Sequence, residues 1–94
     1  MIVAQAGYSV KKKRDKANPL LLAVCQAVHD RREELGISQE ELAHRAGLHR
    51  TYISDIEHGA RNPSLKTLSR LADALELTAS GLIKLGEERS ETGD

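Results

Sequence analysis

Four histidines, one cysteine and several serines and aspartates are the residues whose types suit catalysis or metal binding. His44, His49 and His58 are close in sequence, but no two are spaced to share a helical face at i and i+4, and no cysteine joins them. Cys25 falls in an apolar stripe, which favours a small buried side chain over a redox-active one. Neither a Gly-x-Ser-x-Gly turn nor a glycine-rich phosphate loop is present. The sequence therefore predicts no metal, no cofactor and no small-molecule ligand, and it argues against an enzyme.

A second set of side chains suits recognition rather than catalysis. Arg50, Thr51, Tyr52, Ser54 and Asp55 bring charged and hydrogen-bonding groups into one short run. An arginine can donate two parallel hydrogen bonds to the O6 and N7 atoms of guanine, and a threonine can contact a thymine methyl group or a phosphate. Taken alone, such a run is more typical of a solvated helix face. Its meaning depends on the elements that present it.

Helix-capping signals are the clearest feature of the flanking sequence. Asn18 is an N-cap residue followed by Pro19, which is well tolerated at the first helical position. Gly36 can end this first helix in a left-handed conformation. Ser38 and Glu41 have the spacing of a capping box, in which each residue bonds the other's backbone N–H. These signals predict one helix from about residue 19 to 35 and a second that begins after Ser38.

Three further helices follow in the same way. The second helix ends at Gly47, the third covers about residues 49–58, Ser64 caps the fourth and Thr78 caps a short fifth that ends near residue 85. Leu and Ala dominate the apolar residues and no segment alternates with a period of two, so we expect an all-α fold. The expected core positions are Leu21, Val24, Cys25, Val28, Leu35, Leu42, Ala43, Ala46, Ile53, Ile56, Leu65, Leu68, Leu71, Ala72 and Leu75.

Length and charge divide the chain into three parts. Its 94 residues suffice for one small core, and no apolar run is long enough to span a membrane. Residues 1–17 carry five basic residues against one acidic one, residues 18–85 are close to neutral, and residues 86–94 carry four acidic residues against one basic one. We expect a flexible basic arm, a single helical domain and a disordered acidic tail.

Residues 38–59, SQEELAHRAGLHRTYISDIEHG, have the features of a helix-turn-helix. Two helices of about eight residues are joined by a tight turn at Gly47, where a left-handed backbone is needed for a steep crossing. Ala43 provides the small side chain required where the two helices touch. In this motif the second helix is presented outward. The side chains expected to form the apolar contact between the helices are Leu42, Leu48, Ile53 and Ile56.

Residues 31–77 resemble the phage-repressor and Cro type of helix-turn-helix, the XRE family of bacterial and phage regulators. The shared features are Gln39 at the start of the second helix, Ala43, Gly47, the run Tyr-Ile-Ser-x-Ile-Glu-x-Gly from residue 52, and Asn-Pro-Ser from residue 62. The run HRTYISDIEHGARNPSL is most similar to restriction–modification controller proteins. The resemblance implies a five-helix, lambda-repressor-like DNA-binding domain.

The resemblance also implies roles for individual residues, with a recognition helix at about residues 49–58 in the major groove. Base contacts are expected from Arg50, Thr51, Tyr52, Ser54 and Asp55, and we expect Asp55 either to select a base or to orient Arg50. Arg32 and Glu57 match an ion pair that links the first helix to the recognition helix. Phosphate contacts are expected from Gln39, His49, His58, Arg61, Asn62 and Lys66.

The expected partners are double-stranded DNA and a second copy of the chain. Relatives usually form dimers through the last helix, and Gly81 and Gly86 weaken that helix intrinsically, so we expect it to need a partner surface. The alternative is that its apolar stripe only closes the core. The basic residues 11–14 either follow the DNA backbone or remain solvated. The expected dimer-interface residues are Leu77, Leu82, Ile83 and Leu85.

The sequence thus favours a cytoplasmic, nucleoid-associated, sequence-specific transcriptional regulator that binds a pseudo-palindromic operator as a homodimer, without a membrane partner. Two other classes remain open. One is an antitoxin that binds DNA and a toxin partner, although the short polar tail lacks the apolar extension that such a partner needs. The other is a protein-interaction adaptor with the same fold, which the zero net charge and Asp55 favour.

Overall fold

Five helices make up the part of the chain that the structure, a computed structural model, describes, which is residues 18–92. They are α2 (Pro19–Leu35), α3 (Gln39–Ala46), α4 (Arg50–Glu57), α5 (Leu65–Ala74) and α6 (Ala79–Thr92). The all-α, five-helix fold is therefore confirmed. The expected contact between the basic arm and DNA falls outside the described residues.

Most predicted helix ends are confirmed by the hydrogen bonds of their caps. Asn18 Oδ1 accepts from the backbone N–H groups of residues 20 and 21, at 2.8 and 3.2 Å. Ser38 Oγ accepts from Glu41 N at 3.0 Å. The reciprocal half of this capping box differs from the prediction, because the Glu41 carboxylate instead accepts from Arg45 Nε at 3.0 Å. Thr78 Oγ1 accepts from Gly81 N at 2.9 Å and caps α6.

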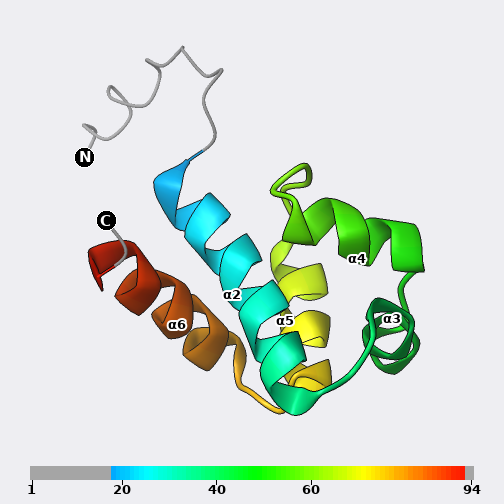
Figure 1. Cartoon of the computed structure of the whole chain (residues 1–94). Helices are drawn as coiled ribbons and strands as arrows, with labels where there is room; N and C mark the ends of the chain where they lie inside the picture. Colours follow the sequence, from blue (N-terminus) through cyan, green and yellow to red (C-terminus); the bar gives the residue numbers. More distant parts are fainter. Residues whose placement is uncertain (1–17, 93–94) are drawn as a thin grey trace.

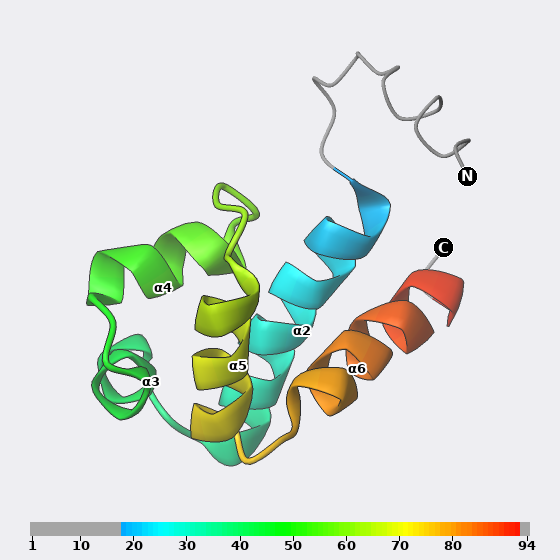
Figure 2. The same ribbon diagram turned by 180° about the vertical axis from the view of Figure 1, so that it is seen from behind.

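Helices α2 and α6 lie side by side and run in opposite directions, whereas α3 and α4 project at the other side of the molecule (Figure 1). Helix α5 packs between these two pairs, as the view from behind also shows (Figure 2). Helix α4 therefore lies far from α6, at an edge of the molecule. None of the helices in residues 18–92 has the length and apolar character needed to cross a bilayer.

Every helix contributes a fully buried aliphatic side chain to one core. Val28 of α2, Leu42 of α3, Ile53 of α4, Leu71 of α5 and Leu82 of α6 are each 0% exposed. Most of the predicted core positions are thereby confirmed. Leu65 is wrong, because it is the first residue of α5 and remains 72% exposed at the surface.

The acidic tail differs from the prediction, because α6 continues through Gly86 to Thr92. Gly86 allows α6 to approach α2 so closely that a Cβ atom there would lie 3.0 Å from the backbone N of Val24. Arg89 pairs with Asp30 of α2 and holds the next turn. The partner surface that α6 was expected to need is thus α2 of the same chain.

One helix ends with strained backbone that the sequence did not indicate. Glu76 follows α5 with φ of 63°, and within residues 18–92 it is the single residue other than glycine with positive φ. The turn is stabilised because Leu77 N donates to Ala72 O at 2.8 Å. Arg31 Nε also donates to Leu75 O at 3.0 Å, which satisfies a free carbonyl at this helix end.

Candidate nucleic-acid interface

The turn between α3 and α4 sets the angle at which α4 is presented. Gly47 adopts φ of 70° and Leu48 N donates to Ala43 O at 2.9 Å, which turns the chain steeply from α3 into α4 (Figure 1). Ala43 is 4% exposed and belongs to the same buried cluster as Ile53 and Ile56. The predicted tight turn, small contact residue and apolar hinge are all present.

Glu57, the last residue of α4, is the centre of a buried polar network. Its side chain is 4% exposed and forms a two-point ion pair with Arg32 of α2: Nε donates to Oε2 at 2.6 Å and Nη2 donates to Oε1 at 3.1 Å. His29 Nδ1 and Gln39 Nε2 also donate to Oε1, each at 3.0 Å. Arg32 Nη1 donates to Ile37 O at 2.8 Å. One carboxylate thus ties α4 to α2 and α3.

The network determines the ionisation of Glu57. Burial alone would raise the pKa of this carboxyl group, but the hydrogen bonds from Arg32, His29 and Gln39 outweigh burial and lower the pKa. The hydrogen bond to Glu57 in turn raises the pKa of Arg32. Both partners of the ion pair are therefore charged at neutral pH, as a structural link between helices requires.

The outer face of α4 carries the run of polar side chains that the sequence indicated. Arg50 and Thr51 are exposed, Tyr52, Ser54 and Asp55 are partly exposed, and the opposite face is buried through Ile53 and Ile56. The structure thus brings all five expected base-contacting residues to one accessible helix. Asp55 does not orient Arg50, because its carboxylate lies 3.3 Å from Arg61 Nε.

The expected phosphate-contacting residues lie around the two ends of α4 and at the start of α5. His49, His58, Arg61, Asn62 and Lys66 are exposed. His49 precedes α4 without a side-chain cap bond, and His58 Nδ1 donates to Ser54 O at 2.7 Å. Gln39 differs from the others because its amide nitrogen already donates to Glu57. Within residues 18–92, no three His, Cys, Asp or Glu side chains are grouped as metal ligands would be.

Two residues of this site, His29 and Glu40, were not predicted from the sequence. His29 joins the Glu57 network, and its i, i+3 spacing to Arg32 on the same face of α2 is a signal that could have identified it. Glu40 lies in the first turn of α3, and its Oε2 is 3.3 Å from Nε of Arg50. No local spacing indicates that pair, because it forms across the turn.

A comparison with protein families identifies the family of this chain. A profile described as helix-turn-helix matches residues 28–82, which include the whole α3–turn–α4 unit and the Glu57 network. The chain belongs to the XRE family of helix-turn-helix regulators. This is a family of DNA-binding transcriptional regulators without enzymatic activity, and it includes phage immunity repressors and restriction–modification controller proteins.

Individual relatives agree with this assignment. The immunity repressor protein of Bacillus phage phi105 is 40% identical over 67 residues, 71% of this chain and 45% of the repressor. Control protein C.BamHI of Bacillus amyloliquefaciens is 49% identical over 47 residues, 50% of this chain and 58% of that protein. This chain therefore spans about half the length of these two curated relatives. A structure of the restriction-modification controller protein C.Esp1396I, a tetramer in complex with its natural 35 base-pair operator, aligns with a TM-score of 0.75 at 32% identity, covering 81% of this chain and all of that one.

The residues expected at a dimer interface of this XRE-family chain divide into two groups. Leu82 is wrong as an interface residue, because it is 0% exposed in the core of the single chain. Leu77 is partly buried against the same core. Leu85 is 36% exposed, and Ile83 lines a shallow apolar groove together with Leu20 and Leu68. Of the four residues expected at the interface, Ile83 and Leu85 are therefore the two on α6 that remain accessible to a second copy.

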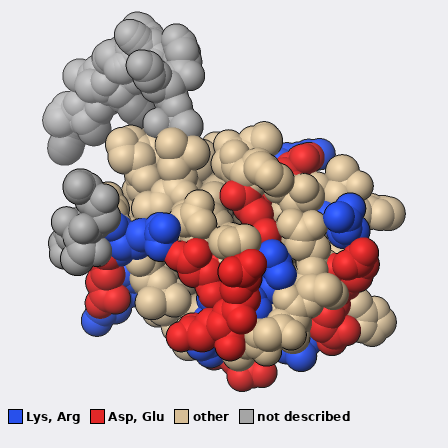
Figure 3. All heavy atoms as spheres, in the orientation of Figure 1, with Lys and Arg blue, Asp and Glu red and all other residues tan. Residues whose placement is uncertain are grey.

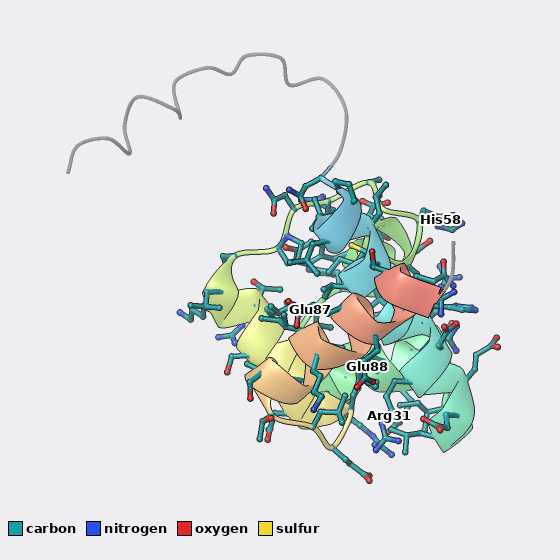
Figure 4. The ribbon with its side chains drawn as sticks, turned by 90° about the vertical axis from the view of Figure 1, so that its left-hand side faces the viewer. Arg31, His58, Glu87 and Glu88 are labelled. Carbon is teal, nitrogen blue, oxygen red and sulfur yellow. The ribbon has the colours of Figure 1, made fainter. Side chains whose placement is uncertain are left out.

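Acidic side chains are gathered on one part of the face that Figure 3 shows. Acidic side chains gather over the lower half of α2 in the view of Figure 3, where Asp30, Glu33 and Glu34 are exposed. Figure 4 shows Arg31 of α2 and Glu88 of α6 at the seam between these helices, away from His58 at the end of α4. The α3–α4 edge carries both signs of charge, because Glu40 lies beside Arg50 and Asp55 lies beside Arg61.

Proposed function

We propose that this chain is a sequence-specific DNA-binding regulator that acts in the cytoplasm as a homodimer on a pseudo-palindromic operator, with α4 as the recognition helix in the major groove. Occupancy of the operator then represses or activates transcription according to its position relative to the promoter. The base-contacting side chains are Arg50, Thr51, Tyr52, Ser54 and Asp55. The backbone-contacting side chains are Gln39, His49, His58, Arg61, Asn62 and Lys66.

The observation that carries this proposal is the two-sided character of α4. One face is anchored by Ile53 and Ile56, each 0% exposed, and by the Glu57 network. The other face presents Arg50 and Thr51 to solvent. A helix held rigidly from behind, with hydrogen-bonding groups in front, is the arrangement that reads base edges in a major groove.

The homodimer rests on α6 and on the relatives. A single recognition helix contacts only a few base pairs, so pairing of two copies on two half-sites increases both affinity and selectivity. The C.Esp1396I relative is described as a tetramer on its operator, which supports assembly of more than one chain on DNA. Leu85 and Ile83 are the α6 side chains that we propose to contact the partner.

The test is selection of bound duplexes from a random-sequence pool at about 150 mM salt, followed by sequencing, because non-specific binding is weak at this ionic strength. We expect an enriched inverted repeat whose half-sites lie about 34 Å apart. Sedimentation should give the mass of two chains on one repeat. If no sequence is enriched, the proposal is overturned and the adaptor alternative is favoured.

Replacement of Arg50 directly tests the proposal that α4 is the recognition helix. Arg50→Ala should weaken operator binding by about 1–3 kcal/mol and relax preference at one base position of each half-site. Arg70→Ala removes the same charge from an exposed position of α5 that is assigned neither to DNA nor to the partner chain, and it serves as the matched control. If Arg50→Ala weakens binding to all sequences equally, Arg50 contacts phosphate instead of a base.

A further inference from the structure

Two arginines at the ends of α4 share an unexpected arrangement. Arg50 is the first residue of α4, and Arg61 follows the helix in the loop before α5. Each has its Nε within 3.3 Å of a carboxylate oxygen, which belongs to Glu40 for Arg50 and to Asp55 for Arg61. Arg61 also lies over the ring of Tyr52, at 4.7 Å from the ring centre. Acidic side chains thus stand on the surface proposed to face DNA.

The position of the contact on the guanidinium group is informative. A guanidinium has five N–H donors in a fixed plane, and guanine offers two acceptors, O6 and N7. When a carboxylate faces Nε, the two Nη atoms at the far end of the group remain available as a pair. Arg50 and Glu40 are 55% and 70% exposed, so this far end is accessible from solvent.

We propose that Glu40 is a positioning residue for base recognition: it holds Arg50 so that the paired Nη atoms point outward in the geometry that reads guanine. This inference rests on the function proposed above. At the other end of α4, Asp55 and the ring of Tyr52 contact Arg61, which is proposed to bind the DNA backbone. The negative charge of Asp55 is therefore paired with Arg61, although Asp55 lies on the surface proposed to face phosphates.

Such a carboxylate has two opposite effects on DNA binding. Its negative charge is repelled by phosphates, so it lowers affinity for every duplex. It also restricts Arg50 to the orientation in which a correct base pairs with both Nη atoms, so a wrong base leaves them unpaired. The ion pair is weak while it is exposed in the free protein, and it strengthens when DNA binding excludes water around it. Glu40 thus trades affinity for discrimination.

The experiment compares Glu40→Gln with the wild type on the selected operator and on duplexes changed at the base position that Arg50→Ala relaxes. We expect Glu40→Gln to bind all duplexes more tightly and to lose about two- to fivefold of its discrimination at that position, the range that corresponds to one exposed ion pair. In the Arg50→Ala background, Glu40→Gln should leave discrimination unchanged. Asp55→Asn should instead change the affinity for all duplexes alike, because its partner Arg61 is proposed to contact the DNA backbone.

Glu41→Gln is the matched control, because it removes the same charge one residue away and contacts Arg45 of its own helix rather than Arg50. It should leave discrimination as in the wild type. Circular dichroism melting of each variant verifies that the fold is retained. Discrimination is the decisive measurement, since a merely structural role would weaken binding to all sequences alike.

Three results would overturn the inference. An equal change in affinity for all duplexes after Glu40→Gln would mean that Glu40 acts only through its charge. If Arg50→Ala changes base preference at no position, Arg50 contacts no base and Glu40 cannot assist it. An enriched operator would still support the proposed function in that case. If the wild type enriches no sequence at all, the proposed function and this inference both fail.

Discussion

Glu57→Gln should destabilise the fold strongly, although it only replaces one carboxylate oxygen with an NH2 group. The carboxylate accepts four hydrogen bonds, two of them from Arg32, and its side chain is 4% exposed while that of Arg32 is 12% exposed. Solvent therefore screens the pair little. The amide of Gln places a donor where an acceptor is needed, so at least one N–H of Arg32 loses its partner, although Arg32 keeps its bond to Ile37 O. We expect a loss of about 3 kcal/mol, the lower end of the range for a broken buried pair.

A loss of this size should lower the midpoint of thermal unfolding by roughly 12–24 °C in a domain this small. Urea unfolding followed by circular dichroism at several pH values is the appropriate assay. Because the pKa of Glu57 is lowered below its ordinary value of 4.5, its contribution is complete above that value and is lost as the pH falls through the lowered pKa. The difference between wild type and variant should therefore shrink in acid.

Glu87→Gln, an exposed change on α6, is the control and should alter stability by less than about 0.5 kcal/mol. Two results would refute the reasoning on Glu57. One is a difference from the wild type below about 1 kcal/mol at neutral pH, which is less than a single charged hydrogen bond contributes. The other is a difference that stays constant through the acid range, which would mean that the lost stability does not come from the ionised carboxylate.

Two further substitutions test the helix ends and the α2–α6 contact. Gly86→Ala should destabilise by about 1–2 kcal/mol, because the new Cβ would lie 2.6 Å from Val24 Cγ2 and 3.0 Å from its backbone, and urea unfolding should show a larger loss than for Gly81→Ala, which meets no backbone atom. Glu76→Gly should stabilise by about 0.5–1 kcal/mol by relieving the positive φ of 63°, whereas Glu76→Ala, which retains the strain, should not; equal midpoints for these two variants would contradict the explanation.

Local signals were sufficient to predict the helices and the turn. Asn18, Ser38, Ser64 and Thr78 cap helices because their side-chain oxygens bond backbone N–H groups within three residues, and such short-range bonds can be read from spacing. Gly47 could be recognised for the same reason. The ion pair of Arg32 with Glu57 spans 25 residues, so it was accessible only through the resemblance to a known family.

Two of the incorrect predictions, the disordered tail and the interface role of Leu82, share a physical cause, which is contact between helices that are distant in sequence. Gly86 lowers the intrinsic helix propensity of this end of α6, and the helix continues there because Gly86 and Arg89 meet α2. The apolar stripe that contains Leu82 predicts that these side chains are buried, but it does not indicate whether they pack against a second copy or against the same chain. The packing of α6 against the same chain decides that Leu82 belongs to the core.

If α4 is the recognition helix, as proposed, the polar contacts at its two ends have different roles. At its C-terminal end, Glu57 is buried and bonded to α2 and α3, so it fixes the orientation of the whole helix. At its N-terminal end, Glu40 is exposed and faces a single arginine, so it can fix only the direction of that side chain. A helix that moved would carry every reading residue with it, which is why the stronger, buried contact is needed for the backbone. The weaker, solvated pair suffices for Arg50, whose guanidinium must still adjust as it meets a base.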